Sequence, residues 1–212
     1  NVIDITNKKF PNLKTYVLGH SMGGAISLSA LDRPIKADAI IISGTGLIPP
    51  LLTTIYKLLI KMQILIFGGK ARSKLIDSIS IRTFNKKFKP NRTRNDWISS
   101  DKNSVDDYTN DPLCGFIVTN QLWYDFINGI SMIRHKNYFS NKNKSIPILV
   151  MSGEYDSATE NSSSSMSLFN LLRKNFNVVK FIKIDNARHE VFTEKTNIRS
   201  FAFNQLIEFI KW

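Results

Sequence analysis

Hydrophobic positions divide the chain into segments of two periodicities. Short, nearly continuous apolar runs are typical of strands buried on both faces of a parallel sheet, whereas apolar residues three or four positions apart indicate amphipathic helices. The short runs occupy residues 15–18, 37–43, 146–151 and 178–184. Helical spacing occupies residues 22–31, 162–176 and 196–212. This alternation predicts an α/β fold in which right-handed crossovers join mostly parallel strands and helices flank the sheet.

The alternation is interrupted between residues 46 and 140. This stretch contains helical patterns but no convincing strand for the sheet. We therefore expect two parts: an α/β core formed by residues 1–45 and 141–212, and a helical insertion formed by residues 46–140.

The most apolar part of the insertion is residues 51–67, which are rich in Leu and Ile. Lys57 and Lys61 are four positions apart and share one helical face. This spacing favours an amphipathic helix that packs its apolar face on neighbours over a membrane-spanning helix. The basic residues between 85 and 94 are most simply a solvated loop.

Composition narrows the possible partners. The chain has 212 residues, of which 42% are hydrophobic, and a formal net charge of +12. No nucleic-acid-binding motif accompanies the charge, so we expect a solvated basic surface, with peripheral contact to an anionic membrane as the alternative. The single cysteine, Cys114, excludes an internal disulfide and fits a cytoplasmic location.

The sequence Gly-x-Ser-x-Gly at residues 19–23 lies between the first predicted strand and the first predicted helix. A sharp strand-to-helix turn holds its serine in strained backbone and exposes the hydroxyl, so Ser21 is a candidate nucleophile. Gly19 and Gly23 are expected because a Cβ at either position would collide with the neighbouring strand and helix. The backbone N–H of Met22, at the helix start, can stabilise a developing oxyanion.

Asp156 and His189 each follow a later predicted strand, at the sheet edge where open α/β sheets place their sites. In the order Ser, Asp, His, Ser21 would attack, His189 would transfer the proton, and Asp156 would orient the imidazole. Each residue also has a non-catalytic alternative: Ser21 as a turn serine, Asp156 as a helix-capping aspartate and His189 as a surface histidine.

Other titratable residues compete for these roles. Glu154 and Asp185 are rival carboxylates, but Glu154 lies earlier in the strand exit and Asp185 is too close to His189 in sequence. His20 is expected to pack below the turn, and His135 lies in the insertion. Three scattered histidines and one cysteine lack metal-ligand spacing, so we expect no metal site.

Gly-His-Ser-Met-Gly-Gly at residues 19–24 resembles the nucleophile elbow of the α/β-hydrolase superfamily, in its monoacylglycerol lipase and lysophospholipase branch. Further stretches similar to a bacterial subgroup of that branch are 96–99 with Tyr108, 111–116, 152–156 and 187–190. The resemblance implies a helical cap at 46–140 that shapes an acyl-chain channel. It also implies a lipid-like ester substrate, such as a monoacylglycerol or lysophospholipid, and no cofactor.

The sequence departs from the family pattern at its N-terminal end. The family begins with several strands and a His-Gly loop that supplies a second oxyanion N–H, whereas this chain starts one helix before the elbow. We therefore expect the C-terminal part of an α/β-hydrolase fold, a missing N-terminal segment and an exposed edge at strand 15–18. The alternatives to an active esterase are a truncated, non-catalytic remnant that binds a lipid or partner, and a thioesterase or peptidase on the same fold.

Overall fold

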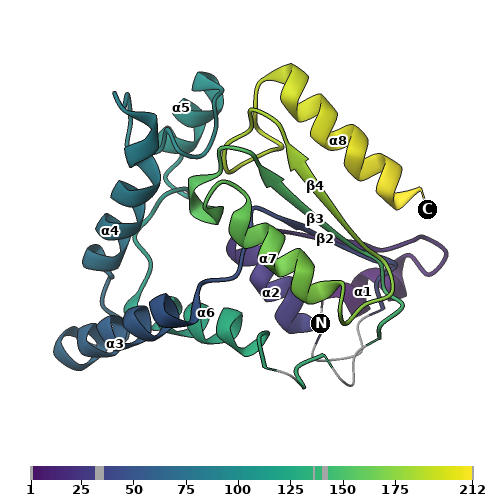
Figure 1. Cartoon of the computed structure of the whole chain (residues 1–212), viewed down its shortest axis with the longest axis horizontal. Coiled ribbons are helices and arrows are strands. Elements are labelled where there is room, and N and C mark those ends of the chain that lie inside the picture. The colour runs from purple at the N-terminus through teal and green to yellow at the C-terminus, as the bar shows by residue number, and fades with distance from the viewer. Residues whose placement is uncertain (1, 32–35, 136, 140–142, 212) are drawn as a thin grey trace.

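The computed structural model describes residues 2–31, 36–135, 137–139 and 143–211. Its centre is a parallel sheet with strand order β1-β2-β3-β4 (Figure 1). The strands are β1 (Tyr16–His20), β2 (Ala39–Ser43), β3 (Ile148–Gly153) and β4 (Val179–Ile184). The predicted strands are confirmed, with ends that differ by one or two residues.

Helices cover both faces of the sheet. Helices α2 (Met22–Ala30) and α7 (Ser163–Leu172) lie on one face, and α8 (Thr196–Ile210) lies on the other (Figure 1). Because side chains alternate along a strand, Ile40 and Ile42 pack in the cluster with α2 and α7, whereas Ile41 packs in the cluster with α8. The predicted last helix ends at Ile210, and Trp212 lies outside the described residues.

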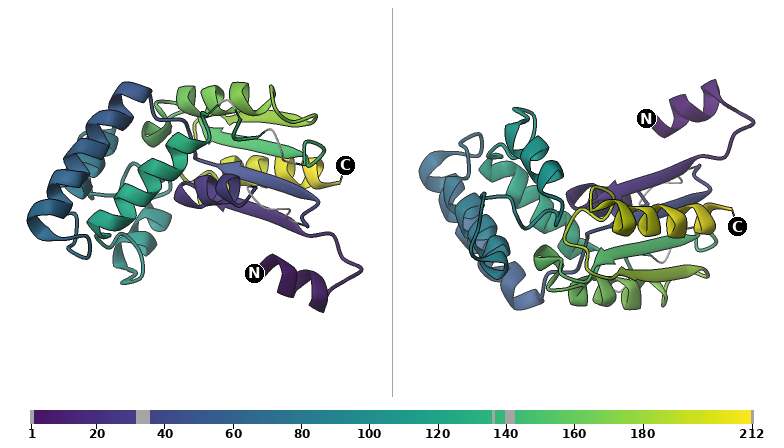
Figure 2. Two further views of the ribbon diagram at one scale, coloured as in Figure 1. Left: turned by 90° about the horizontal axis from the view of Figure 1, so that it is seen from below. Right: turned by 90° about the horizontal axis from the view of Figure 1, so that it is seen from above.

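Between β2 and β3 the chain forms a group of helices beside the sheet, called the helical lobe below (Figure 2). It contains α3 (Pro50–Phe67), α4 (Lys74–Asn85), the short 3-10 helix η1 (Lys86–Phe88), α5 (Lys102–Asn110) and α6 (Asn120–Met132). The loop predicted at 85–94 is wrong for residues 86–88, which form η1. The predicted boundary between core and insertion near 140 falls on undescribed residues and stays a prediction.

Helix α3 packs apolar side chains against α6, as predicted: Ile60, Tyr56 and Leu59 cluster with Trp123 and Ile127. Lys57 lies on the α6 side, where its Nζ donates to Ser131 Oγ at 2.8 Å, and Lys61 lies over the ring of Tyr124. The outward face is apolar and consists of exposed Leu51, Ile55, Leu58, Met62 and Leu65. The predicted packing of an apolar face on neighbours is therefore confirmed on the α6 side, where Ile60 is buried, whereas the prediction missed the second, outward apolar face.

The N-terminal helix α1 (Val2–Lys9) has no buried residue and stands apart from the sheet (Figure 2). The strand that follows, β1, pairs with β2 on one side and forms an edge of the sheet. Leu18 in this strand is 47% exposed. The predicted exposed edge is confirmed.

Candidate active site

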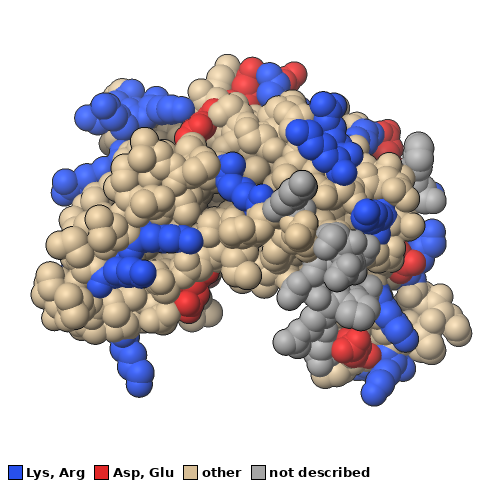
Figure 3. Space-filling view, turned by 60° about the horizontal axis from the view of Figure 1, so that its bottom comes forward, with Lys and Arg blue, Asp and Glu red and all other residues tan. Residues whose placement is uncertain are grey.

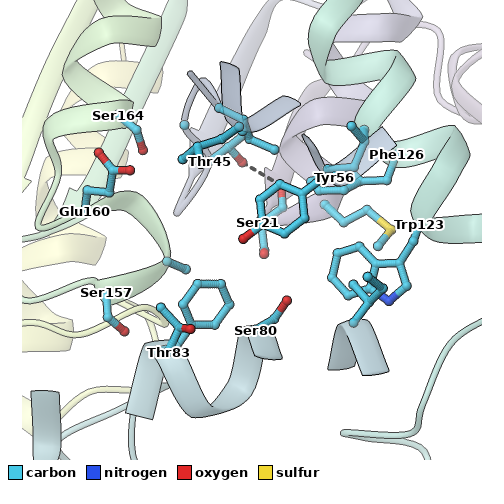
Figure 4. A pocket seen from close by; sticks show the side chains of 18 of the residues that line it. Ser21, Thr45, Tyr56, Ser80, Thr83, Trp123, Phe126, Ser157, Glu160 and Ser164 are labelled. Carbon is cyan, nitrogen blue, oxygen red and sulfur yellow. Dashed lines mark hydrogen bonds between the residues drawn. The ribbon is translucent and has the colours of Figure 1, made fainter. Parts of the chain in front are cut away.

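Ser21 occupies a strained turn between β1 and α2. Its backbone has φ 52° and ψ −118°, a region that residues with a side chain rarely adopt. The backbone is fixed from the neighbouring strand, because Ser21 N donates to Ser43 O at 2.8 Å and Thr45 Oγ1 donates to Ser21 O at 2.6 Å (Figure 4). Met22 begins α2, and the first N–H groups of a helix have no partner within it. This is the geometry expected of a nucleophile elbow.

The glycines around Ser21 differ in how much space surrounds them. A Cβ on Gly19 would overlap the carbonyl oxygen of Gly23 and the hydroxyl of Ser27, which confirms the prediction for that position. The prediction for Gly23 is wrong, because a Cβ there would have nothing within 4 Å. Gly24 is the close-approach position in α2, where a Cβ would overlap the Thr45 hydroxyl.

His189 and Asp156 lie together at the carboxyl ends of the strands. Nδ1 of His189 is 3.0 Å from both carboxylate oxygens of Asp156, and the two residues are 3% and 0% exposed. Asp156 also caps the 3-10 helix η2 (Ser157–Thr159) by accepting a hydrogen bond from Ala158 N at 2.9 Å. The carboxylate therefore has both a capping role and the position needed to orient an imidazole.

Burial and pairing act in opposite directions on this pair. Burial alone lowers the pKa of His189, but the charge of Asp156 and its hydrogen bond outweigh it and raise that pKa above 6.5. Burial raises the pKa of Asp156, but the charge and hydrogen bond of His189, with hydrogen bonds from Thr159 and Ala158, lower it overall. At neutral pH the carboxylate is charged and able to stabilise an imidazolium.

The rival carboxylates have other partners. Glu154 accepts from Lys183 Nζ at 3.2 Å and from Asn186 N at 3.0 Å. Asp185 is exposed and lies 3.8 Å from Lys183 Nζ. Asp156 is therefore the carboxylate that contacts His189.

Two further rings contact the imidazole of His189. The ring centroids of His20 and Trp97 each lie 4.8 Å from that of His189. His20, which was predicted to pack below the turn, thus packs against the imidazole of His189. Burial and the charge of His189 lower the pKa of His20 to about 3, so His20 stays neutral beside it. His135 is exposed just after α6, away from these rings.

A cavity of about 390 Å³ opens from Ser21 into the helical lobe (Figure 4). Tyr56, Trp123 and Phe126 form part of its apolar wall, together with several Leu and Ile side chains. Polar groups also line the cavity: the hydroxyl groups of Ser80, Thr83, Ser157 and Ser164, and the carboxylates of Asp77 and Glu160. In the described part of the chain no hydrogen bond joins Ser21 Oγ to His189, although Ser21 contacts Thr45 and His189 lies beside the adjacent residue Gly44.

Sequence reasoning missed part of this site. Trp97 belongs to a stretch singled out by resemblance, but nothing in the pattern assigned it to His189. Glu194 is fully buried in the loop that carries His189, yet a glutamate five positions after a histidine carries no sequence signal of burial. Among the described residues, no cluster of three His, Cys, Asp or Glu side chains could hold a metal ion.

Comparisons with known proteins place the whole chain beside hydrolases. The human monoglyceride lipase is 24% identical over 207 residues, which are 96% of this chain and 60% of that protein. A thermostable carboxyl esterase from Bacillus coagulans, solved with glycerol, superposes with a TM-score of 0.83 at 24% identity, over 98% of this chain and 67% of that one. A soluble variant of monoglyceride lipase from Saccharomyces cerevisiae, solved with a substrate analog, gives 0.67 at 19% identity, over 99% and 69%.

These solved structures share the α/β-hydrolase fold, and this chain spans about three fifths of the human relative's length. The hydrolase family described as serine aminopeptidase, S33, matches residues 1–196. Since that match includes the elbow, the helical lobe and the His189 loop, the chain belongs to the serine aminopeptidase S33 family of hydrolases.

Proposed function

We propose that this protein is a serine esterase that cleaves carboxylic esters with an apolar acyl chain. The observation that carries the proposal is one juxtaposition. Ser21 stands at a strained elbow that opens into an apolar cavity, and the buried Asp156–His189 pair lies at the same ends of the strands. The monoglyceride lipase relatives and the carboxyl esterase neighbour support an ester substrate.

In the first step Ser21 Oγ attacks the ester carbonyl carbon while Nε2 of His189 takes the hydroxyl proton. The carbonyl oxygen becomes an oxyanion, which the N–H of Met22 stabilises together with the positive end of α2. The C–O bond to the alcohol then breaks, and His189 returns the proton to the departing alkoxide. The product is an acyl group bound to Ser21.

In the second step water attacks the acyl-serine carbonyl and gives a proton to His189. The second tetrahedral intermediate breaks at the serine oxygen, which recovers the proton, and the carboxylic acid leaves. Asp156 stays ionised throughout and holds the imidazolium. The raised pKa of His189 makes this imidazole a stronger base than an unperturbed histidine.

The charges that line the cavity favour a neutral ester over a lysophospholipid. The chain carries a formal net charge of +12, yet the cavity lining includes Asp77 and Glu160 and no described Lys or Arg. Asp77 is paired with Arg94 at 2.8 Å, which leaves Glu160 as the lining carboxylate without a cationic partner among the described ion pairs. A phosphate-bearing alcohol would meet this carboxylate with no compensating cation, so we expect glycerol-type neutral esters to be preferred.

Labelling with a fluorophosphonate probe tests the reaction. The folded protein should react at one site, and Ser21→Ala should abolish the reaction. A matched control is Ser29→Ala, which removes a serine from the same helix without touching the elbow. A folded sample that does not label would favour the non-catalytic alternative.

A substrate panel then separates the remaining alternatives. Monoacylglycerols, lysophospholipids, acyl thioesters and aminoacyl amides with equal acyl chains should be cleaved in that order of preference. Faster cleavage of the thioester or the amide would reassign the protein to a thioesterase or a peptidase on the same fold.

We also propose peripheral membrane contact through α3. Among the described helices, α3 is the one long and apolar enough to cross a membrane by length and composition. Only 11% of this helix is buried inside the protein. Its exposed apolar face and its position beside the cavity fit a helix that lies on a lipid surface. On the face shown in Figure 3, Lys and Arg side chains lie in several separate groups that could contact anionic headgroups. A cytoplasmic location stays a prediction.

Co-sedimentation with vesicles tests this contact. Binding to vesicles rich in phosphatidylserine should weaken as salt increases, because salt screens the surface charges. Leu65→Ser on α3 should reduce binding at every salt concentration, whereas Ile207→Ser on the exposed side of α8 should not. Equal binding by both variants would contradict a role for α3.

A further inference from the structure

The loop that carries His189 is joined to one segment of the helical lobe by a buried network. The segment is 95–101, between η1 and α5, and the loop is 187–195, between β4 and α8. Glu190 N donates to Ile98 O at 2.7 Å, and Ser99 Oγ donates to Thr193 O at 3.0 Å. These bonds join residues more than 90 positions apart in the sequence.

Glu194 is the centre of this network. Its side chain is 0% exposed, and its carboxylate accepts hydrogen bonds from both sides of the junction. Ser100 N lies 3.0 Å from each carboxylate oxygen, and the Ser100 hydroxyl donates to one of them. Arg188 N, next to His189 in the chain, donates to the other at 2.7 Å. A buried carboxylate that accepts several N–H and O–H groups is held in one position.

The side chain of Arg188 also joins the loop to segment 95–101, but as a hydrogen-bond donor, whereas Glu194 is an acceptor. Its guanidinium donates to the carbonyl oxygens of Asp96 and of Ser99, the latter at 3.0 Å, and lies 4.1 Å from the centre of the Phe88 ring. Thus the carboxylate extends from the His189 loop to backbone N–H groups, and the guanidinium extends from the same loop to backbone carbonyls.

The network reaches the reacting centre through Trp97. This residue lies between Asp96 and Ser99, whose carbonyls Arg188 holds, and its ring contacts the imidazole of His189 at 4.8 Å. Trp97 also lines the cavity. Fixing segment 95–101 therefore fixes one of the surfaces against which the His189 ring rests.

We propose that Glu194 is a positioning residue: it clamps the His189 loop to segment 95–101, and so holds the imidazole between Asp156 and the cavity mouth. The role in turnover rests on the proposed function, in which His189 is the base. The positioning role concerns the order of the His189 ring, so it can be tested without measuring turnover.

The test uses Glu194→Gln in the full chain. The amide keeps the shape but places an NH₂ group against N–H donors, so at least one bond of the network is lost. The matched control is Glu208→Gln, the same chemical change on the exposed side of α8. A second control, Leu172→Ala, destabilises the core beneath the sheet without touching the network.

Two readouts are taken. In protein labelled with ¹⁵N-histidine, the Nδ1 proton shared with Asp156, assigned by its loss in His189→Asn, should exchange with water about 10-fold faster in Glu194→Gln. In hydrolysis of a soluble ester, kcat should fall by about 10- to 100-fold with KM little changed, because misplacing a reacting group costs rate rather than binding. Glu208→Gln and Leu172→Ala should match the wild-type protein in both readouts.

The outcomes separate the two proposals. Unchanged exchange of the His189 proton in folded Glu194→Gln, or equal acceleration in Leu172→Ala, would overturn the positioning role. If Glu194→Gln does not fold, Ser100→Ala, which removes one donor, decides by the same readout: faster exchange supports the role and unchanged exchange overturns it. An inactive wild-type protein would refute the esterase proposal while leaving the proton-exchange result to decide the clamp.

Discussion

The sheet and the helical lobe differ in how firmly they are packed. Every residue of β2 and of β3 is buried, whereas α3 buries Thr53 and Ile60 among its 18 residues. Ser21, Asp156 and His189 all follow strands of the sheet, and most of the apolar cavity wall comes from the lobe. The difference indicates a division of labour: the sheet, with segment 95–101 of the lobe, fixes the reacting groups, and the loosely packed α3 side of the lobe determines which ester reaches them.

The largest effect that would sharpen this comparison is expected at Asp156. Asp156→Asn should lower kcat by about 10⁴-fold, because the amide favours the wrong imidazole tautomer and no longer stabilises the imidazolium. Activity requires neutral His189, so kcat/KM should rise with pH through the His189 pKa, which lies above 6.5. Removing the carboxylate leaves burial as the dominant influence, which lowers that pKa and moves the midpoint to lower pH.

A pH profile of soluble-ester hydrolysis from pH 5 to pH 9 measures both quantities. A midpoint that stays in place in Asp156→Asn would show that another group sets the acid limb.

Two cavity-creating substitutions compare the packing of the two regions directly. Ile148 in β3 and Ile60 in α3 are both 0% exposed. Ile148→Ala should cost about 2–5 kcal/mol of global unfolding free energy. Ile60→Ala should instead open the lobe locally, so that amides of α3 and α6 exchange faster while those of β3 keep their protection.

Native-state hydrogen exchange with denaturant unfolding as the reference distinguishes the two. If Ile60→Ala speeds exchange in β3 as much as in α3, the lobe and the sheet unfold as one unit and the proposed division fails.

The elbow glycines offer a matched pair within the rigid part. Gly19→Ala should destabilise the protein by about 1–3 kcal/mol, because the new methyl group overlaps the Gly23 carbonyl oxygen and separates α2 from β1. Gly23→Ala should be neutral or stabilise by up to about 1 kcal/mol, because space is open there and alanine favours a helix. Thermal unfolding of both variants measures the contrast; equal destabilisation would contradict it.

The smallest expected effect concerns the cavity carboxylate. Glu160→Gln should raise kcat/KM for a lysophospholipid relative to a monoacylglycerol of equal chain length by about 3- to 10-fold, because it removes repulsion of about 1 kcal/mol. Competition between the two substrates in one assay measures the ratio directly. An unchanged ratio would place the phosphate away from Glu160.

The sequence was informative where a local pattern determines the outcome. The apolar runs located the four strands of the described residues, and the residues that follow them supplied Ser21, Asp156 and His189. The pattern failed where only tertiary packing decides. The clearance around Gly23, the contact of His20 with His189 and the burial of Glu194 depend on elements distant in sequence. The outward apolar face of α3 was missed because spacing defines a helix face but not the direction it points.

Because β1 lies at the edge of the sheet, the backbone fluctuations of Ser21 depend on what pairs with that edge. Ser21 follows a strand whose hydrogen-bond ladder has one neighbour, β2, so the other row of backbone groups faces outward. Any segment that pairs with that free row adds cooperative support to the strand and narrows the backbone fluctuations that reach Ser21. By thermodynamic reciprocity, if pairing of such a segment strengthens the binding of a reversible ligand at Ser21, that ligand strengthens the binding of the segment by the same factor.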